Sequence, residues 1–176
     1  MAITIELRRH TDNDGDALTD DGVAAALALG RSHVGEDWTL VVSTGAQRAT
    51  QTAANVLAAA GSSVADGVLV EPGLRSADEE RWRAAYRRAG SGELDALRTA
   101  DPAFVDAEVV TLGAALGRVA DRLPEGGRAL VIGHSPTNEA AVLGLTGTTL
   151  APLSTGAGAI LVRADGDWAV TPVDAA

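Results

Sequence analysis

Two of the three histidines lie beside residues that could do chemistry with phosphate. His10 follows Arg9, His134 follows Gly133, and Arg48 lies between these segments in the sequence. An imidazole can act as a nucleophile or exchange a proton near neutral pH. A guanidinium offers a planar pair of donors to two phosphate oxygens. These residue types together indicate a site that binds a phosphoryl group.

The residue types that are absent exclude several other kinds of catalysis. All fourteen basic residues are arginine, and the chain contains neither lysine nor cysteine. A Walker A phosphate loop, a pyridoxal enzyme and a kinase each require a lysine. Cysteine phosphatases, cysteine proteases and thiolate metal sites require cysteine. Any phosphate chemistry in this chain must use arginine, histidine and backbone amides.

The elements that must position these residues can be read from the sequence pattern. Short apolar runs predict strands at residues 3–7, 40–43, 67–70 and 129–132. Helix patterns separate them at residues 20–31, 47–60, 78–88, 93–98 and 105–123, and again after Ser135-Pro136. Two further runs flank Asp165-Gly166 and predict a closing hairpin. The alternation predicts a three-layer α/β/α sandwich with a mostly parallel central sheet.

Each candidate segment follows the carboxyl end of a predicted strand. Arg9-His10 follows the first strand, Thr44 to Arg48 the second, and Gly133-His134 the fourth. Open α/β sheets bind ligands at this edge, so we expect the segments to converge. Helices that begin there add amide donors for an anion.

Helix-capping patterns refine the expected boundaries. Thr19 is expected to cap the helix at residues 20–31. The segment from Thr44 to Gln47 has the spacing of a capping box for the next helix. Pro136 is expected at the first helical position, where proline is favoured.

Composition limits the class of protein and its partners. The chain has 176 residues, of which 46% are apolar, and a net charge of −10. We expect one domain over residues 1–176. The charge argues against nucleic acid or an anionic membrane as partner. No apolar stretch could span a membrane, and the polar N-terminus does not resemble a signal peptide, so a cytoplasmic location is expected. A monomer and a homodimer are equally compatible with the sequence.

Three motifs, in order, resemble those of the histidine phosphatase superfamily. Residues 7–11 (LRRHT) and 18–22 (LTDDG) are similar to its RHG motif and the helix start that follows. Residues 43–53 (STGAQRATQTA) resemble its second segment, and residues 131–134 (VIGH) resemble its late histidine segment. Each motif alone is weak, but their order over residues 3–143 is specific. The resemblance implies a phosphoglycerate mutase-like fold and a phosphatase, with mutase activity less expected for a chain this short.

The resemblance also implies roles for individual residues. His10 attacks phosphorus and forms a phosphohistidine, and nearby positive charge keeps it neutral. Arg9, Arg48 and a protonated His134 hold the phosphate oxygens, so no metal or cofactor is expected. Further substrate contacts are assigned to Thr11, Asp16 and Ser135. The implied substrate is a small anionic phosphorylated molecule, including phosphomonoesters and phosphohistidine, or a phosphoprotein.

Three positions depart from the family pattern. Thr11 replaces a glycine, and Gly45 replaces a proline. Ser76 stands where many members have the glutamate that serves as general acid. Asp78, Glu79 or Glu80 could substitute, and we assign Glu79; alternatively, a leaving group such as phosphohistidine needs no strong acid.

Two other functions are compatible with the same residues. Ser76 and Thr11 favour a non-catalytic module that binds a phospholigand without turnover. Asp14 and Asp16 could instead bind a metal in a metal-dependent hydrolase, although their loop lacks the spacing of an EF-hand. A solvated loop is the simpler interpretation of these aspartates.

Several residues outside the motifs have simple structural interpretations. His33 is expected to be a solvated residue at a helix end. Arg8 is expected to point to the face of the sheet opposite to Arg9. The arginine-rich stretch from Arg75 to Arg88 is either a solvated helix or a rim that attracts anionic substrate. Trp82 and Tyr86, at helical spacing within it, belong either to the core or to an interface.

Overall fold

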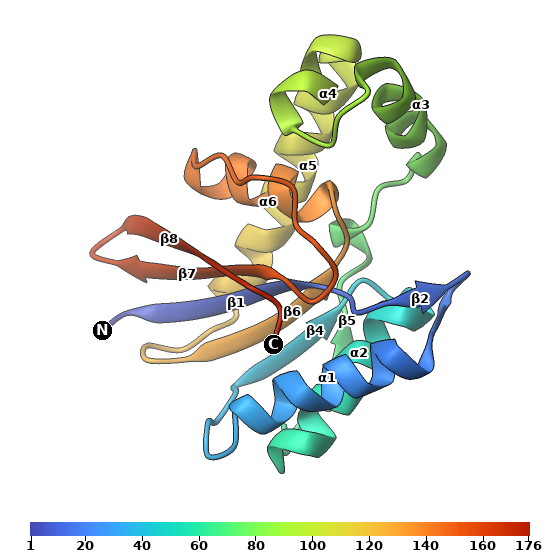
Figure 1. Cartoon of the computed structure of the whole chain (residues 1–176). Helices are drawn as coiled ribbons and strands as arrows, with labels where there is room; N and C mark the ends of the chain where they lie inside the picture. The colour runs from blue at the N-terminus through green and yellow to red at the C-terminus, as the bar shows by residue number, and fades with distance from the viewer.

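The computed structural model describes all 176 residues and contains a six-stranded sheet (Figure 1). Its strands follow the order β5 (Val68–Val70), β4 (Leu40–Ser43), β6 (Arg128–Gly133), β1 (Ile3–Arg9), β7 (Gly158–Ala164) and β8 (Asp167–Val173). The first four strands are parallel, and β7 and β8 form an antiparallel hairpin on β1. The predicted mostly parallel sheet and closing hairpin are therefore confirmed.

Helices cover both faces of the sheet. Figure 1 shows α1 (Asp20–Ser32) and α2 (Gln47–Ala60) on one face, and α5 (Pro102–Asp121) and α6 (Thr137–Thr146) on the other. This arrangement is the predicted three-layer α/β/α sandwich. None of the helices is both long and apolar enough to cross a membrane.

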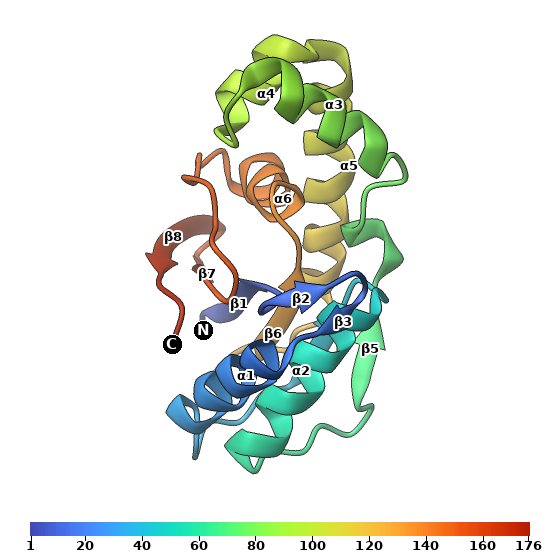
Figure 2. The ribbon, with the colours of Figure 1, turned by 45° about the vertical axis from the view of Figure 1, so that its right-hand side comes forward.

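Two more helices stand away from the sheet. The 3-10 turn η1 (Pro72–Leu74) leads from β5 to α3 (Glu79–Ala89) and α4 (Leu94–Ala100), which lie beyond the start of α5 (Figure 2). A short hairpin of β2 (Asn13–Asp14) and β3 (Ala17–Leu18) follows β1. Segments 10–19 and 71–100 thus project past the carboxyl ends of the parallel strands.

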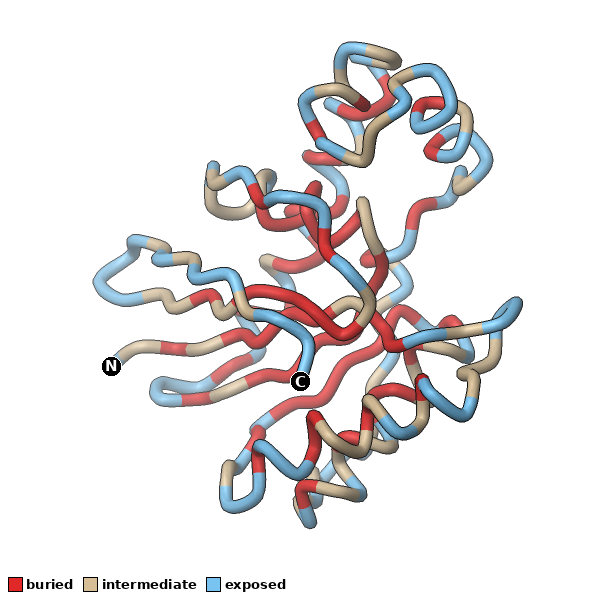
Figure 3. Tube along the Cα trace, in the orientation of Figure 1, coloured by how far each residue is buried: buried red, intermediate tan, exposed pale blue.

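Strand residues alternate between two cores. Val42 and Val131 pack with α5 and α6, whereas Val41 and Leu130 pack with α1 and α2. The alternation follows from the two-residue period of an extended chain. Figure 3 shows the buried backbone concentrated in the strands between the helical layers. Burial on both faces explains why β4 and β6 read as continuous apolar runs.

The predicted helix starts have mixed outcomes. The Thr19 cap is confirmed, because its hydroxyl oxygen accepts a hydrogen bond from the Gly22 N–H at 3.0 Å. The predicted capping box is wrong: Ala46 is the residue before α2, and it makes no side-chain cap. Pro136 also precedes its helix and is not the first helical residue. The Thr44 hydroxyl lies before this start: it accepts from the Ala46 N–H at 3.5 Å and contacts Nε2 of His134 at 2.7 Å.

Candidate active site

The ends of three adjacent parallel strands bring the predicted segments together. Arg9 is paired in register with Gly133, and Ser43 with Ile132. The backbone N–H of His10 donates to the Gly133 carbonyl at 2.9 Å. The rings of His10 and His134 have their centroids 5.2 Å apart. Residues 124 positions apart in the sequence therefore form one site, as the sheet topology predicts.

His10 is buried and oriented by its own backbone neighbour. Its Nδ1 lies 2.8 Å from the carbonyl oxygen of Thr11. A carbonyl can only accept, so Nδ1 carries the proton and Nε2 has a free lone pair. Burial, followed by the charges of Arg48 and Arg9, lowers the pKa of His10 to about 4. The ring is therefore neutral near pH 7. Burial lowers its pKa more than the nearby positive charge does, although the sequence indicated only the charge.

His134 does not have the charge state expected from the sequence. Burial, and then the positive charge of Arg48, lower its pKa to about 3. The ring is therefore neutral near pH 7, and the expectation of a protonated His134 is wrong for the unliganded protein. Its Nε2 lies 2.7 Å from the hydroxyl of Thr44, whereas its buried Nδ1 has no hydrogen-bond partner. The group available to a bound anion is thus an imidazole fixed by Thr44.

Two guanidinium groups supply the positive charge of the site. Arg9 is half-buried, and its Nη1 donates to the carbonyl oxygen of Leu153 at 2.7 Å. Arg48 lies in the first turn of α2, and its Nη1 donates to Oδ1 of Asp16 at 2.7 Å. The charges of both arginines contribute to the lowered pKa of His10. Arginines fixed by such contacts are suited to binding phosphate oxygens.

Asp16 interacts with the protein's own anion-binding groups. One oxygen pairs with Arg48, and the other accepts from the backbone N–H of Gln47 at 3.2 Å, at the start of α2. These hydrogen bonds lower the pKa of Asp16, so it is ionised. A guanidinium and a helix N-terminus are the partners that a phosphate would use. The geometry makes Asp16 a counter-charge to Arg48, which differs from the substrate contact predicted for it.

The glycine that replaces the family's proline is required by the backbone. Gly45 has φ +88°, a conformation that proline cannot adopt. A Cβ at this position would lie 2.9 Å from Cγ1 of Val70. The backbone at position 45 of this chain thus excludes proline and favours glycine.

The two remaining predicted substrate contacts lie in different surroundings. Thr11 is buried, and its hydroxyl is 3.3 Å from that of Thr52 on α2. That contact places the Thr11 side chain between the loop after β1 and α2. Ser135 lines a cavity beside His134, and its hydroxyl is 2.5 Å from Oε1 of Glu139. The structure therefore brings Ser135 to the site and leaves Thr11 as a packing residue.

A cavity of about 430 Å³ opens between the strand ends and α3. Its walls come from α2, from the segment 75–87 and from the start of α6. The lining residues are Arg48, Arg75, Ser76, Glu79, Trp82, Arg83, Tyr86, Arg87, His134, Ser135, Pro136 and Thr137. His10 is not among them, so the cavity adjoins the predicted site through His134 and Arg48. Its volume is within the range of small-molecule sites.

Glu79 lies in this cavity with a charge state that does not suit a general acid. Its Oε1 accepts from Nε of Arg75 at 2.6 Å, and this hydrogen bond lowers its pKa. The carboxylate is ionised near neutral pH and has no proton to donate. The hydroxyl of Ser76 accepts from the Asp78 N–H, and Asp78 caps α3. The geometry therefore argues against Glu79 as the general acid.

The arginine-rich stretch divides between two environments. Arg75, Arg83 and Arg87 line the cavity, although each also pairs with Glu79 or Glu80. Arg81 and Arg88 pair with Asp101 on the opposite side of α3. Trp82 is buried, and its indole N–H donates to Glu108, whereas Tyr86 is exposed. The solvated-helix interpretation fits Arg81 and Arg88, and the attraction of an anionic substrate by the cavity-lining arginines stays a prediction.

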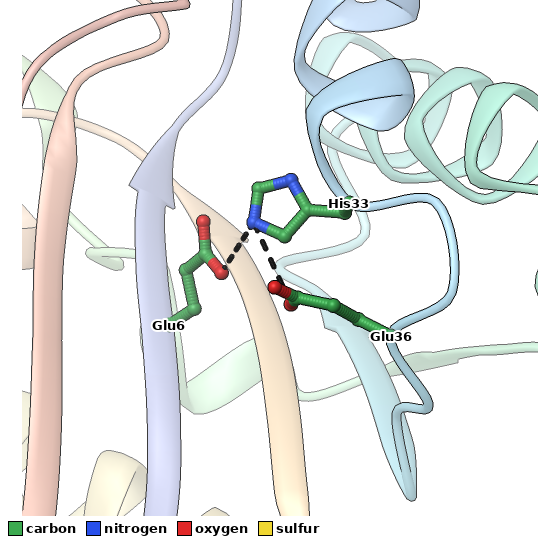
Figure 4. A group of neighbouring side chains, drawn as sticks. All are labelled: Glu6, His33 and Glu36. Atoms are coloured by element: carbon green, nitrogen blue, oxygen red, sulfur yellow. Dashed lines mark hydrogen bonds and ion pairs between the residues drawn. The ribbon is translucent and has the colours of Figure 1, made fainter.

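The loop aspartates do not form a metal site. Asp12 accepts from the Thr19 hydroxyl, Asp14 is exposed, and Asp16 pairs with Arg48. The three side chains that could jointly offer metal ligands are Glu6, His33 and Glu36, on the α1 face of the sheet (Figure 4). Their carboxylates already accept from Arg8 and Arg128. These arginines make the cluster a network of ion pairs.

His33 is buried within this network, so the expectation of a solvated residue is wrong. Its Nε2 lies 2.9 Å from Oε2 of Glu6 (Figure 4). Its Nδ1 lies 2.8 Å from the Leu29 carbonyl. Arg8 is on the same face and pairs with Glu6 at 2.8 Å. The prediction that Arg8 and Arg9 point to opposite faces is confirmed. Glu6 and Arg8 are charged residues on the α1 face of β1, where the neighbouring strand β6 carries apolar side chains. Glu6 pairs with both Arg8 and His33.

Sequence reasoning missed two contacts of the site. Thr44 was expected to cap a helix, and its hydroxyl instead contacts His134. Glu139 was not singled out, although it follows Ser135 by four residues at the start of a helix. Residues at that spacing lie on the same helix face, which is a signal that could have linked them.

Comparisons with known proteins agree with this geometry. Residues 4–156 match the model of the histidine phosphatase superfamily (branch 1). A phosphoglycerate mutase from Bacillus anthracis str. Sterne has 19% identity and a TM-score of 0.70, with 98% of this chain and 92% of that chain covered. A search of curated protein sequences found no match.

Two phosphatases are also among the similar structures. Phosphoserine phosphatase from Entamoeba histolytica, in complex with 3-phosphoglyceric acid, has 16% identity and a TM-score of 0.70, covering 96% of this chain and 95% of that one. The protein histidine phosphatase SixA, complexed with tungstate, has 22% identity and a TM-score of 0.62, covering 97% and 94%. These similarities establish the phosphoglycerate mutase-like fold.

Proposed function

Because the chain belongs to the histidine phosphatase superfamily, we propose that it is a metal-independent phosphatase that forms a covalent phosphohistidine on His10. The observation that carries the proposal is the state of His10. Its ring is neutral, with Nδ1 bound to the Thr11 carbonyl and Nε2 free to attack. An imidazole prepared in this way is a nucleophile without further deprotonation.

The surrounding groups support the reaction in two steps. In the first, Nε2 of His10 attacks phosphorus and the leaving group departs into the cavity. In the second, water attacks the phosphohistidine and releases phosphate. In this proposal Arg9, Arg48 and His134 hold the phosphoryl oxygens in both steps, and the arginines offset the charge that develops on them. A metal ion is not required for that charge stabilisation.

The cavity supports a small anionic substrate. Arg75, Arg83 and Arg87 line the volume into which the leaving group departs, in a protein whose net charge is −10. Four arginines and one glutamate line the cavity, so the lining carries a net positive charge that attracts anions. We therefore propose phosphomonoesters whose leaving group carries a second negative charge, with phosphohistidine or a phosphoprotein as further candidates.

The test is hydrolysis of p-nitrophenyl phosphate with a chelator present, for the wild type and His10→Ala. We expect turnover that survives chelation and is abolished in the variant, together with an acid-labile phosphoenzyme in the wild type alone. Circular dichroism of both proteins controls for folding. Activity that is lost to the chelator would indicate a metal mechanism instead.

The same experiment tests the non-catalytic alternative. A phospholigand-binding module would bind inorganic phosphate but form no phosphoenzyme from either p-nitrophenyl phosphate or phosphohistidine. The ionised state of Glu79 and the serine at position 76 are the observations that favour this alternative.

A further inference from the structure

Glu139 is a buried carboxyl group for which the two-step reaction above has no role. It lies in the first turn of α6, with 1% of its surface exposed. Its Oε1 accepts from the Leu153 N–H at 2.8 Å and lies 2.5 Å from Oγ of Ser135. Its Oε2 is buried and has no hydrogen-bond partner. Such surroundings disfavour an ionised carboxylate, because part of its charge is left without a donor.

The protonation state of Glu139 differs from that of Glu79. Burial raises the pKa of Glu139, and this effect outweighs the hydrogen bonds from Ser135 and Leu153 and the charge of Arg9, which lower it. Arg9, on β1, is the charged group that faces Glu139. The Arg75 hydrogen bond lowers the pKa of Glu79. Of these two carboxyl groups near the cavity, Glu139 is the one that retains a proton to higher pH.

Ser135 connects this carboxyl group to the leaving-group side of the site. Ser135 lines the cavity beside His134, and its hydroxyl contacts the carboxyl group of Glu139. The Ser135 hydroxyl donates to Oε1 when Glu139 is ionised, and only a protonated carboxyl group can reverse this direction. When Glu139 is protonated, Oε1–H donates to Oγ, and the hydroxyl of Ser135 is then free to donate into the cavity.

On the basis of the proposed function, we infer that Ser135 protonates the leaving-group oxygen and that Glu139 resupplies its proton. As Nε2 of His10 bonds to phosphorus, the P–O bond breaks and its electron pair remains on the leaving oxygen. That oxygen takes the proton from Oγ of Ser135, and Oγ takes the proton from Oε1 of Glu139. The resulting carboxylate is stabilised by Arg9.

The second step returns the proton. Water attacks phosphorus and gives a proton to Oγ of Ser135, which passes one to Glu139. The P–N bond breaks, its electron pair returns to Nε2 of His10, and phosphate is released. The relay supplies the acid that Ser76 and Glu79 do not, and it extends the substrate class to alkyl phosphomonoesters, whose alkoxide leaves poorly without a proton.

The experiment compares leaving groups that do and do not need a proton. We would measure kcat/KM, which reports steps through P–O cleavage, for p-nitrophenyl phosphate and for an alkyl phosphate such as 3-phosphoglycerate. The proteins are the wild type, Glu139→Gln, Ser135→Ala, Glu79→Gln and Glu6→Gln. Glu6 is the matched control because it is also a glutamate with 1% exposure, but it lies on the other face of the sheet.

The relay predicts a selective loss. Glu139→Gln and Ser135→Ala should each lower kcat/KM for the alkyl ester by about 100-fold, while p-nitrophenyl phosphate changes by less than about 3-fold. Glu6→Gln should affect neither substrate selectively. Equal losses on both substrates would indicate a merely structural role and overturn the inference. A loss of kcat/KM for the alkyl ester that occurs only in Glu79→Gln would also overturn the inference.

The wild type alone also tests the relay if a variant fails to fold. With the relay, kcat/KM depends weakly on the basicity of the leaving group across a series of aryl and alkyl esters. A steep dependence would rule out an internal acid while leaving His10 catalysis of aryl esters intact. Failure of the proposed function is different, since p-nitrophenyl phosphate turnover would then be absent or would survive His10→Ala.

Discussion

The hydroxyl of Thr44, at the end of β4, lies 2.7 Å from Nε2 of His134, at the end of β6. Neighbouring strand ends thus fix the orientation of an imidazole whose other nitrogen has no partner. Thr44→Val keeps the shape of the side chain but removes this hydrogen bond. We expect a 3- to 10-fold lower kcat/KM for p-nitrophenyl phosphate, since a net hydrogen bond is worth about 1 kcal/mol. Thr44→Ser should retain most of the activity, and loss in both variants would contradict this role.

Asp16 holds Arg48 and the start of α2 in the absence of substrate. Its carboxylate is a like charge beside the position proposed for a phosphoryl group. Asp16→Asn removes that charge but can still accept a hydrogen bond from Arg48. We expect inorganic phosphate to inhibit p-nitrophenyl phosphate hydrolysis at about 3- to 10-fold lower concentration, an electrostatic change of roughly 1 kcal/mol. The difference should shrink at high salt, and weaker inhibition would show that Asp16 helps to bind the anion.

Two adjacent arginines on opposite sides of α3 allow a matched test of whether the cavity binds a negatively charged leaving group. Arg87 lines the cavity, whereas the adjacent Arg88 pairs with Asp101 outside it. Arg87→Gln should raise the KM for 3-phosphoglycerate about 3- to 10-fold, since one charge interaction near the surface is worth roughly 1 kcal/mol. Arg88→Gln should leave that KM unchanged, as should either variant with p-nitrophenyl phosphate. Equal effects of the two substitutions would contradict a specific anion contact by Arg87.

The buried histidines make stability depend on pH. The pKa of His10 is about 4 in the folded protein, below its ordinary value of 6.5. As the pH falls through 6.5, the unfolded chain takes up a proton first, so the folded state loses stability until the pH approaches 4. Between pH 7.5 and 5, His10 should contribute about 2 kcal/mol of this loss.

Urea unfolding of the wild type and His10→Asn at both pH values measures that contribution. Asparagine does not titrate, so the variant should lose about 2 kcal/mol less than the wild type over this interval. His134→Asn should behave similarly, because burial also lowers the pKa of His134, to about 3. Identical pH dependence in the wild type and both variants would refute the buried, neutral state of these rings.

Local sequence determined most of the elements. The apolar run at 40–43 became β4 with the predicted bounds, and Thr19 caps α1 as predicted. Such features depend on neighbouring residues: strand propensity, side-chain alternation and a hydroxyl near free backbone N–H groups. The order of three motifs also determined the family and the pair of histidines, because parallel strands must present their carboxyl ends at one edge.

Tertiary structure decided the charge and the partners of the side chains. Nothing near His134 in the sequence shows that burial keeps it neutral, or that Thr44, 90 residues away, fixes its ring. Likewise, His33 reads as a solvated helix end until β1 places Glu6 beside it. Desolvation and long-range hydrogen bonds depend on which elements pack together, so they cannot be read from local pattern. The sequence determined the two histidines and the arginines of the site, and packing decided their partners and which side chains carry a proton there.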